Sequence, residues 1–531
     1  MAVRWKPSVS SVGYVHFNSE LYLLRMVSIT SLCLAAMISA PASPARIRSG
    51  DLRKITVDAS APVGHLRSLQ GVNGAPTPGG GYRMARIDLV RTRSEVLNIF
   101  PDPDGDANDP RSYNFGPTDQ IIASIRKVGA QVMFRLSRSE GADSQPPKDF
   151  DKYAAIARHI VLHYNRGWAK GFHYRIRYWE IWNEPDLGKV FWAGTAQQYY
   201  ELYGKLARAV KAADAHALVG GPAIARPNDD TPYRDAFLEY VRTEHLPLDF
   251  YSWHWYATDS DDPLDFTRIS RDTRARLDKH GFNHTRSMVT EWNYGLMDPL
   301  PTAVQRASFI TAAVIYMQDA PIDAANLYKA DNVFGSDGAT PDKTGQALVA
   351  LGRLKDTPYR LRVRGADLNG FAVEAARSAD GRTVQILVSN YQIPPEFLGP
   401  RTADDVLHVP PMFDVRLLAR RSISYRNNSG YDLTVDHLPV NRRYSVDRCR
   451  ISAAHDFTNL EPRLYVNAPI RLQKELPPPG IELITIRAIG STPADAATHR
   501  STDAPDASEP AAEPASSDEH CGASSAVAFV K

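Results

Sequence analysis

Two glutamates stand in segments that could support acid–base and nucleophilic chemistry. Glu184 lies in WEIWNEP, residues 179–185, and Glu291 lies in VTEWN, residues 289–293. Cleavage of a glycosidic bond needs such a pair, because one carboxylic acid protonates the departing oxygen while the other attacks the anomeric carbon or activates a water. A separation of about 5–5.5 Å gives retention of configuration and about 6.5–9.5 Å gives inversion. The sequence alone leaves both outcomes open.

Residues close to these glutamates in the sequence could bind a sugar and set the charges of the pair. Asn183 could donate to a sugar hydroxyl, and such bonds to the 2-hydroxyl strengthen in the transition state. His254 and Tyr256 could hold Glu291 ionised by donating a hydrogen bond. Aromatic rings near strand ends could stack on sugar faces, although such rings are also ordinary core material. These rings belong to Trp182, Trp255, Trp292 and Tyr294.

Short apolar segments alternate with longer amphipathic ones between residues 60 and 355, as expected of repeated βα units. Eight segments could be strands, and eight is the number that closes a parallel barrel. They cover residues 69–74, 86–92, 131–137, 177–183, 218–223, 249–255, 287–293 and 323–328. One intervening helix begins with a capping box of Thr195 and Gln198. The predicted fold is α/β, a (β/α)8 TIM barrel, whose strand ends would bring Glu184 and Glu291 to one cleft.

The remaining chain predicts a second domain and two tails. Residues 356–490 contain short strand-like segments between Gly, Pro, Asn and Asp turns, which indicates a C-terminal β-sandwich. Residues 46–59 form a linker, in which Lys54–Val57 could add a strand to that domain. Residues 491–531 are rich in Ala, Ser and Pro and predict a disordered tail.

Residues 1–45 are typical of a secretory leader. An apolar run at 27–40 follows Arg25, and the small residues that end at Ala40 and Ala45 suit signal peptidase. We therefore expect a secreted or periplasmic protein, and the alternative is a disordered cytoplasmic extension. The three cysteines have neither zinc-site nor CxxC spacing, so no disulfide framework and no metal site are expected.

The charge balance gives no sign of a nucleic-acid partner. The chain has 62 basic and 60 acidic residues, a formal charge of +2. It lacks a run of about 20 apolar residues, so no transmembrane helix is expected. No dinucleotide or phosphate-loop motif occurs, and no cofactor is predicted. The oligomeric state is not indicated.

The glutamate motifs resemble those of glycoside hydrolase family 39, which includes β-xylosidases and α-L-iduronidases. The likeness covers about residues 60–490, because that family also pairs its barrel with a β-sandwich. It implies retention, Glu184 as the acid/base, Glu291 as the nucleophile and no metal. The family often shows Val-Arg-Thr-His on its second strand, where this chain has VRTR at residues 90–93. Arg91 keeps its place as a substrate or nucleophile contact, and Arg93 replaces the histidine.

Glu180 is a useful comparison for the predicted pair. It lies four residues before Glu184, so about 13 Å lower along an extended strand. That depth is too great to serve the same bond, and we expect a buried structural charge paired with Arg86 or Arg135.

The predicted function is hydrolysis of O-glycosidic bonds in an oligo- or polysaccharide, with Glu184 protonated and Glu291 ionised in the free enzyme. Two alternatives remain at this point. A transglycosylase would use the same site but pass the glycosyl unit to a sugar acceptor. A catalytically silent protein on the same fold would bind carbohydrate only.

Overall fold

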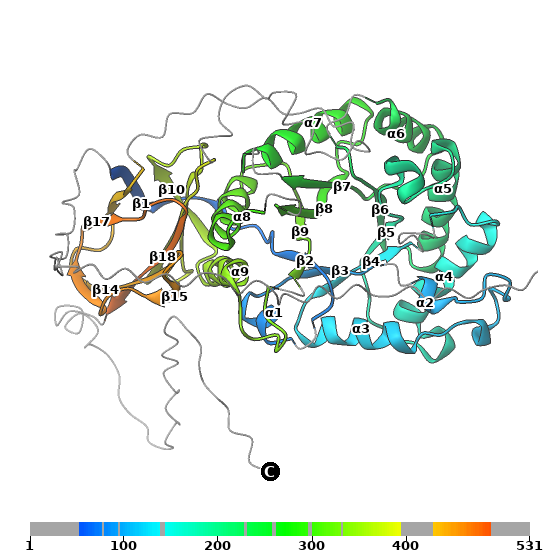
Figure 1. The fold of residues 1–531 in the computed structure, drawn as a ribbon, viewed down its shortest axis with the longest axis horizontal. Coiled ribbons are helices and arrows are strands. Elements are labelled where there is room, and N and C mark those ends of the chain that lie inside the picture. The colour runs from blue at the N-terminus through cyan, green and yellow to red at the C-terminus, as the bar shows by residue number, and fades with distance from the viewer. Residues whose placement is uncertain are drawn as a thin grey trace, which may run out of the picture. The chain divides into compact units, whose positions relative to one another are not determined.

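Eight parallel strands close into a barrel in the computed structural model (Figure 1). The structure describes residues 52–489 apart from 77–78, 94–95, 138–143, 228–230, 258–261, 296–299, 331–332 and 394–427. The barrel strands are β2 (Gly71–Asn73), β3 (Leu89–Arg91), β4 (Gln131–Leu136), β5 (Tyr178–Ile181), β6 (Leu218–Ile224), β7 (Phe250–Ala257), β8 (Arg286–Tyr294) and β9 (Ala324–Leu327). Each pairs in parallel with the next, and β9 returns to β2. The predicted barrel is confirmed.

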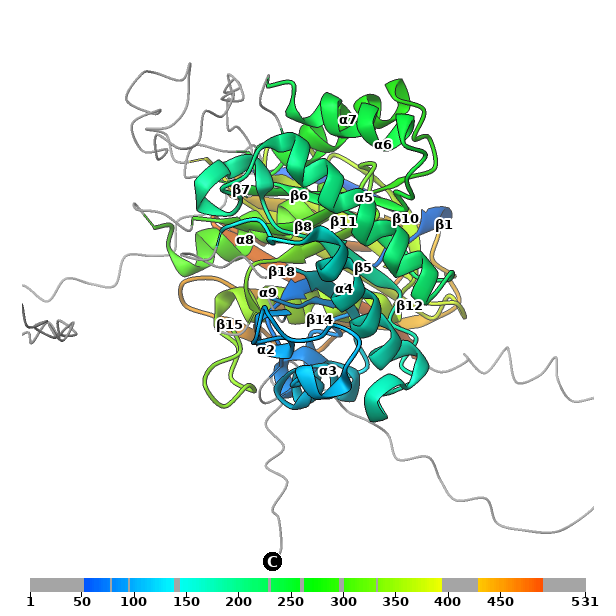
Figure 2. The same cartoon turned by 90° about the vertical axis from the view of Figure 1, so that its right-hand side faces the viewer.

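Amphipathic helices cover the outside of these strands. They are α1 (Gly80–Met84), α2 (Val96–Ile99), α3 (Gly116–Lys127), α4 (Phe150–Arg166), α5 (Ala196–Ala213), α6 (Tyr233–Thr243), α7 (Asp265–Lys279), α8 (Ala303–Met317) and α9 (Lys343–Arg353). Thr195 and Gln198 form the predicted capping box at the start of α5. The helices α4 and α5 pack against each other on the outside of the barrel (Figure 2). Helices α3 to α7 bury one face against the strands, whereas α8 and α9 are buried on nearly all sides. Their apolar residues and the outward residues of the strands form one core.

The second domain is a mixed sheet. It contains β1 (Leu52–His65), β10 (Tyr359–Arg364), β11 (Phe371–Arg377), β12 (Thr383–Asn390), β13 (Gly430–Asp436), β14 (Arg443–Ile451), β15 (Asp456–Asn459), β16 (Leu464–Asn467), β17 (Ile470–Glu475) and β18 (Gly480–Ile489). The strand order is β15-β14-β18-β12-β11-β10-β1-β13-β17, and β16 pairs with β14. Val446 in β14 and Leu472 in β17 belong to one apolar core, separate from that of the barrel. Strands from both ends of the order thus share a core, as in a sandwich.

The strand predicted at Lys54–Val57 is present but longer than expected. As β1 it runs to His65, past residue 59, and pairs antiparallel with β10 and parallel with β13. Alternating burial from Ile55 to Ala59 explains why this part joins the sheet. The predicted leader, residues 1–45, and the predicted tail, residues 491–531, lie outside the described residues.

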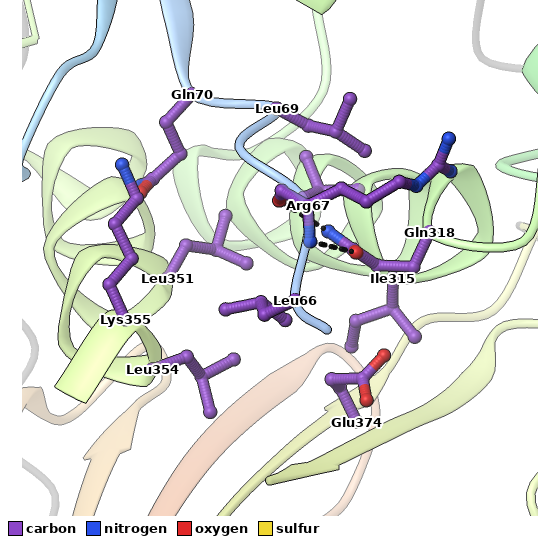
Figure 3. Close-up of a pocket in the computed structure, with 11 residues that line it drawn as sticks. Leu66, Arg67, Leu69, Gln70, Ile315, Gln318, Leu351, Leu354, Lys355 and Glu374 are labelled. Carbon is purple, nitrogen blue, oxygen red and sulfur yellow. Dashed lines mark hydrogen bonds between the residues drawn. The ribbon is translucent and has the colours of Figure 1, made fainter. Parts of the chain in front are cut away.

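The second domain, called the β-domain below, packs against α8 of the barrel. The Ser389 hydroxyl donates to the Ser308 carbonyl (2.8 Å), and the Gly370 amide donates to the Tyr316 hydroxyl (2.8 Å). A cavity of about 20 Å³ lies close by, beside Leu66 and the paired Arg67 and Gln318 (Figure 3). It is at the amino ends of the barrel strands, so it is remote from the end where barrel active sites form. Among the described residues, no helix is both long and apolar enough to cross a membrane.

Candidate active site

The two predicted glutamates meet at the carboxyl ends of the barrel strands. Glu184 follows β5, the fourth barrel strand, and Glu291 lies near the end of β8, the seventh. His254 in β7 is in register with Glu291. One carboxylate oxygen of each glutamate and one ring nitrogen of His254 all lie within 4.8 Å of one another. The sequence therefore predicted this convergence from strand order alone.

Glu184 sits in a sharp turn after β5. Its backbone is left-handed, with a φ of 46° and a ψ of 49°, and its amide donates to the Ala223 carbonyl at the end of β6 (2.9 Å). Only 7% of the residue is exposed. One carboxylate oxygen lies 2.7 Å from His254 Nδ1. A proton shared between these two atoms keeps both in a defined orientation.

Glu291 is surrounded by donors and positive charge. Arg91 Nη1 donates to one carboxylate oxygen (2.5 Å), and the Tyr256 hydroxyl donates to the other (2.5 Å). The guanidinium of Arg135 lies 3.7 Å away. Burial alone would raise the pKa of Glu291, but His254, Arg91, Arg135 and the Tyr256 hydroxyl together lower it to about 2. Glu291 is therefore an anion at any ordinary pH.

Tyr256 stays a neutral donor in this setting. Burial, with the negative charges of Glu291 and Glu184, raises the pKa of Tyr256 well above its usual value. Its ring also packs edge-on against Tyr328, with 6.0 Å between centroids. The hydroxyl is thus fixed toward Glu291 and stays protonated, so it can donate its hydrogen bond.

Arg91 links several of the site residues. Fully buried, it donates through Nε to Glu180 (2.5 Å), through Nη1 to Glu291 and through Nη2 to Asn183 Oδ1 (2.9 Å). The charges of Glu180 and Glu291 raise the pKa of Arg91 although burial opposes this. Asn183 Oδ1 also accepts from Arg135 (3.0 Å). Both bonds fix the amide of Asn183 in one orientation.

The buried charge at Glu180 is confirmed, but its predicted partner is wrong. Glu180 pairs with Arg91, whereas Arg86 pairs with Asp356 at the surface. Arg135 instead turns toward Asn183 and Glu291. The Arg91 side chain bonds to both Glu180 and Glu291. Glu180, which lies deeper in the barrel, is therefore linked to Glu291 through Arg91.

The structure does not bring Trp292 to the cluster. Neighbouring residues of a strand point to opposite faces, so Trp292 turns away from the barrel interior when Glu291 faces it. It is 1% exposed and packs edge-on against Phe266 of α7, with 5.1 Å between centroids. Trp182 and Tyr294 are likewise buried, against Trp192 and Phe309. These rings are core material.

Two further residues join the network that the sequence analysis did not place there. Asn73, the last residue of β2, accepts from Arg91 (3.2 Å) and donates to the Thr290 carbonyl (2.9 Å). The other is Arg135, which the sequence indicates only as a partner of Glu180. The signal for Asn73 was available, because a polar residue at the carboxyl end of a barrel strand faces the cleft.

The donor set could in principle hold a metal ion. Glu184, His254 and Glu291 offer two carboxylates and an imidazole, and they are the group of this kind found in the described part of the chain. However, Arg91 and Arg135 already place two cations beside Glu291. A third positive charge there would be repelled, so the arrangement suits a charge-compensated carboxylate better than a metal ligand.

The chain matches the family described as glycosyl hydrolases family 39 over residues 86–389. A β-xylosidase from Caldicellulosiruptor saccharolyticus is 25% identical over 53% of this chain and 64% of its own length. One from Geobacillus stearothermophilus is 28% identical over 48% of this chain and 49% of its own length. The match thus spans less than two thirds of these relatives.

A solved structure agrees over a greater length. A glucosidase from Croceicoccus marinus is 34% identical, with a TM-score of 0.75, over 83% of this chain and all of that one. The fold is also shared with a family 39 enzyme from Xanthomonas axonopodis pv. citri, with a TM-score of 0.62 at 17% identity over 82% of this chain and 98% of the other. On the family match and this similarity, the chain belongs to glycosyl hydrolases family 39.

Proposed function

We propose that the protein is a retaining glycosidase that cleaves O-glycosidic bonds with Glu291 as nucleophile and Glu184 as acid/base. The single observation that carries this proposal is the separation of the pair. Oxygens of Glu184 and Glu291 lie within 4.8 Å of each other, whereas an inverting enzyme keeps its carboxyl groups about 6.5–9.5 Å apart to admit a water. This spacing leaves room for direct attack.

The reaction has two displacements. In the first, Glu291 attacks the anomeric carbon while Glu184 donates its proton to the departing oxygen, which leaves a glycosyl ester on Glu291. In the second, Glu184 removes a proton from water, and the water displaces Glu291 from the anomeric carbon. His254, bonded to Glu184, holds the acid in place in both steps.

Asn183 fits a role in binding the sugar at the reacting centre. Its Oδ1 is occupied by Arg91 and Arg135, so its Nδ2 is left to donate. A donor beside the acid can reach the 2-hydroxyl, where hydrogen bonds strengthen in the transition state. The other role predicted for Arg91, a contact to the nucleophile, is supported by its bond to Glu291.

The names of the relatives support a proposal for the substrate class. Two are named β-xylosidases and one a glucosidase. We propose a β-linked xylosyl or glucosyl unit as the group that is cleaved. The paired glutamates and their donors also favour an enzyme over a silent carbohydrate-binding protein, because binding alone needs no charge-compensated nucleophile.

The stereochemistry of the first product tests the proposal. The protein is incubated with 4-nitrophenyl β-xyloside and β-glucoside, and the released sugar is followed by proton NMR before it mutarotates. We expect the β-anomer to appear first. Initial release of the α-anomer would show inversion and would refute the double displacement.

The hydrogen bond from Tyr256 should influence the pH at which kcat/KM falls on the acid side of its pH profile, here called the acid limb. Glu291 acts as an anion, so activity is lost as pH falls through its pKa. The Tyr256→Phe variant removes a donor that lowers this pKa, so the acid limb of kcat/KM should move to higher pH. The maximum should fall about 10- to 100-fold, as expected for a lost hydrogen bond to a charged group.

A matched control is Tyr294→Phe. It removes a hydroxyl that bonds to Tyr391 (3.2 Å) on the outer side of β8, away from Glu291. The acid limb should then stay where the wild-type protein has it. An unmoved limb in Tyr256→Phe would contradict the role of that hydroxyl.

We also propose that the protein is exported. The apolar run at residues 27–40 supports this proposal, and so does the disulfide bond of Cys449, because disulfides persist in oxidising compartments. Amino-terminal sequencing of the protein from its host should find a start near residue 41 or 46, and an intact leader on mature protein would contradict export.

A further inference from the structure

Three residues with left-handed backbones cluster at the ends of two neighbouring strands. Trp182 and Glu184 follow β5 with φ values of 73° and 46°, and Ala223 lies near the end of β6 with a φ of 55°. Residues other than glycine adopt this conformation only where the surrounding structure enforces it. The turn that presents Glu184 must therefore be held by its neighbours.

The first support is a direct backbone bond between the two turns. The Glu184 amide donates to the Ala223 carbonyl (2.9 Å). The Ala223 amide in turn donates to the hydroxyl of Ser252 in β7 (2.9 Å). These contacts fix one side of the Glu184 turn but leave the segment after it, residues 185–190, without a tie to β6.

Asp186 supplies that second tie. One of its carboxylate oxygens accepts from the Ala225 amide (3.0 Å), and the other accepts from the Arg226 amide (2.9 Å). The residue thus spans from the turn after β5 to the turn after β6. No cation pairs with Asp186 in the described ranges of residues 52–489, so its two acceptor atoms serve backbone amides.

The charge of Asp186 is costly at this place. Burial, with the charge of Glu184 close by, raises the pKa of Asp186 to about 7, although the two amides act in the opposite direction. The charge of Asp186 also acts on Tyr233 of α6 and Tyr251 of β7. A neutral residue would fit this place more easily if only packing mattered.

We propose that Asp186 is a positioning residue for the acid Glu184. Its carboxylate joins the two turns, and this holds the Glu184 side chain toward the departing oxygen of the substrate. The inference rests on the proposed function and deepens it, because it names the device that aims the proton donor. Asp186 itself touches neither the substrate nor the reacting atoms.

The test compares two substrates with the same sugar. The dinitrophenolate group departs from its glycoside without protonation, whereas departure of phenol needs a proton from the acid. We define the selectivity as kcat/KM for the first divided by kcat/KM for the second. It does not depend on the fraction of folded enzyme, so a partly unfolded variant still gives an answer. Assays run at pH 8, where wild-type Asp186 carries its charge.

Both Asp186→Ala and Asp186→Asn should raise this selectivity by about tenfold or more, since a misplaced acid loses part of its usual 10²- to 10⁴-fold contribution. Asp249→Asn is the matched control. Asp249 accepts from the Val219 amide (2.8 Å) at the amino end of β6, where it cannot affect Glu184. Its selectivity should equal that of the wild-type protein. Equal losses on both substrates in the Asp186 variants would overturn the proposal.

A structural readout separates this inference from the proposed function. In a crystal structure of Asp186→Ala, the contact between Glu184 and His254 Nδ1 should lengthen beyond its present 2.7 Å. An unchanged turn and an unchanged contact would overturn the positioning role, whatever the activity of the wild-type protein.

Discussion

Replacing Glu291 by glutamine should abolish turnover of a dinitrophenyl β-glycoside. The amide keeps the volume of the carboxylate but cannot attack the anomeric carbon. A good leaving group is used so that acid catalysis by Glu184 does not limit the rate. Loss of a nucleophile costs on the order of 10⁴- to 10⁶-fold in kcat, judged by other covalent mechanisms. The measurement is kcat with saturating substrate.

The Glu291→Ala variant identifies the role of the residue. It leaves a space on the face that Glu291 attacks, and azide can enter there. Azide attack on a β-glycoside from that face gives an α-glycosyl azide, which NMR distinguishes from the β-azide. Recovery of activity with the α-product is expected. Recovery with a β-azide would assign Glu291 to the acid/base role instead.

Glu374→Gln provides a matched control in the same chain. Glu374 is a buried glutamate in β11 that pairs with Arg360, as Glu291 pairs with Arg91, but it belongs to the β-domain. Removal of its charge, far from Glu291, should leave kcat unchanged. A comparable loss of kcat in this variant would mean that Glu291→Gln acts through the fold.

The negative charge of Glu291 should stabilise the folded protein at neutral pH. Its pKa is lowered from 4.5 to about 2 by folding, so the ionised residue stabilises the native state at any pH above its unfolded value. That contribution is lost as pH falls from about 4.5 through 2. Thermal unfolding of wild-type protein and Glu291→Gln should therefore differ at pH 7 and converge toward pH 2. A difference that persists at pH 2 would contradict the shift.

The convergence of Glu184 and Glu291 could be predicted from the sequence because it depends on topology. Eight βα units must place all strand ends on one rim, whatever the side chains inside. The motif around Glu184 on the fourth strand and that around Glu291 on the seventh then suffice to bring the two together. Their separation was not accessible, since it depends on the turn that raises Glu184 above β5.

Strand periodicity argues against the predicted role of Trp292 in substrate binding. Adjacent strand residues face opposite sides, so Glu291 and Trp292 cannot both line the cleft. The same rule applied to Asn183 would fail, because Asn183 lies beyond the end of β5 and no longer obeys the alternation. The alternation of side chains predicts which face a residue points to only inside a strand, not in the turn that follows it.

The sequence does not predict which side chains of neighbouring barrel strands pair with each other. The sequence predicted Arg86 or Arg135 as the partner of Glu180, but the shear of neighbouring strands decides which arginine reaches it. In the structure Arg91 takes Glu180 and Glu291 together, so one guanidinium couples two levels of the barrel. Such a choice is made by the register of β3, β4 and β5.

Replacing Glu184 by alanine should separate the two chemical steps. With a phenyl glycoside, departure needs a proton, so kcat/KM should fall by about 10²- to 10⁴-fold. With a dinitrophenyl glycoside the first step continues, while the second slows because no base activates water. The glycosyl ester on Glu291 should then accumulate, which a rapid burst of dinitrophenol and a lowered KM would report.

Azide gives the complementary signature in this variant. It needs no base, so it should discharge the glycosyl ester and raise kcat for the dinitrophenyl substrate. Attack on the ester from the side vacated by Glu184 yields a β-glycosyl azide, opposite to the product expected of Glu291→Ala. Equal loss of kcat/KM on both leaving groups, without a burst, would remove Glu184 from the acid role. Since the two variants should give azides of opposite configuration from one substrate, the pair of results assigns both carboxylates.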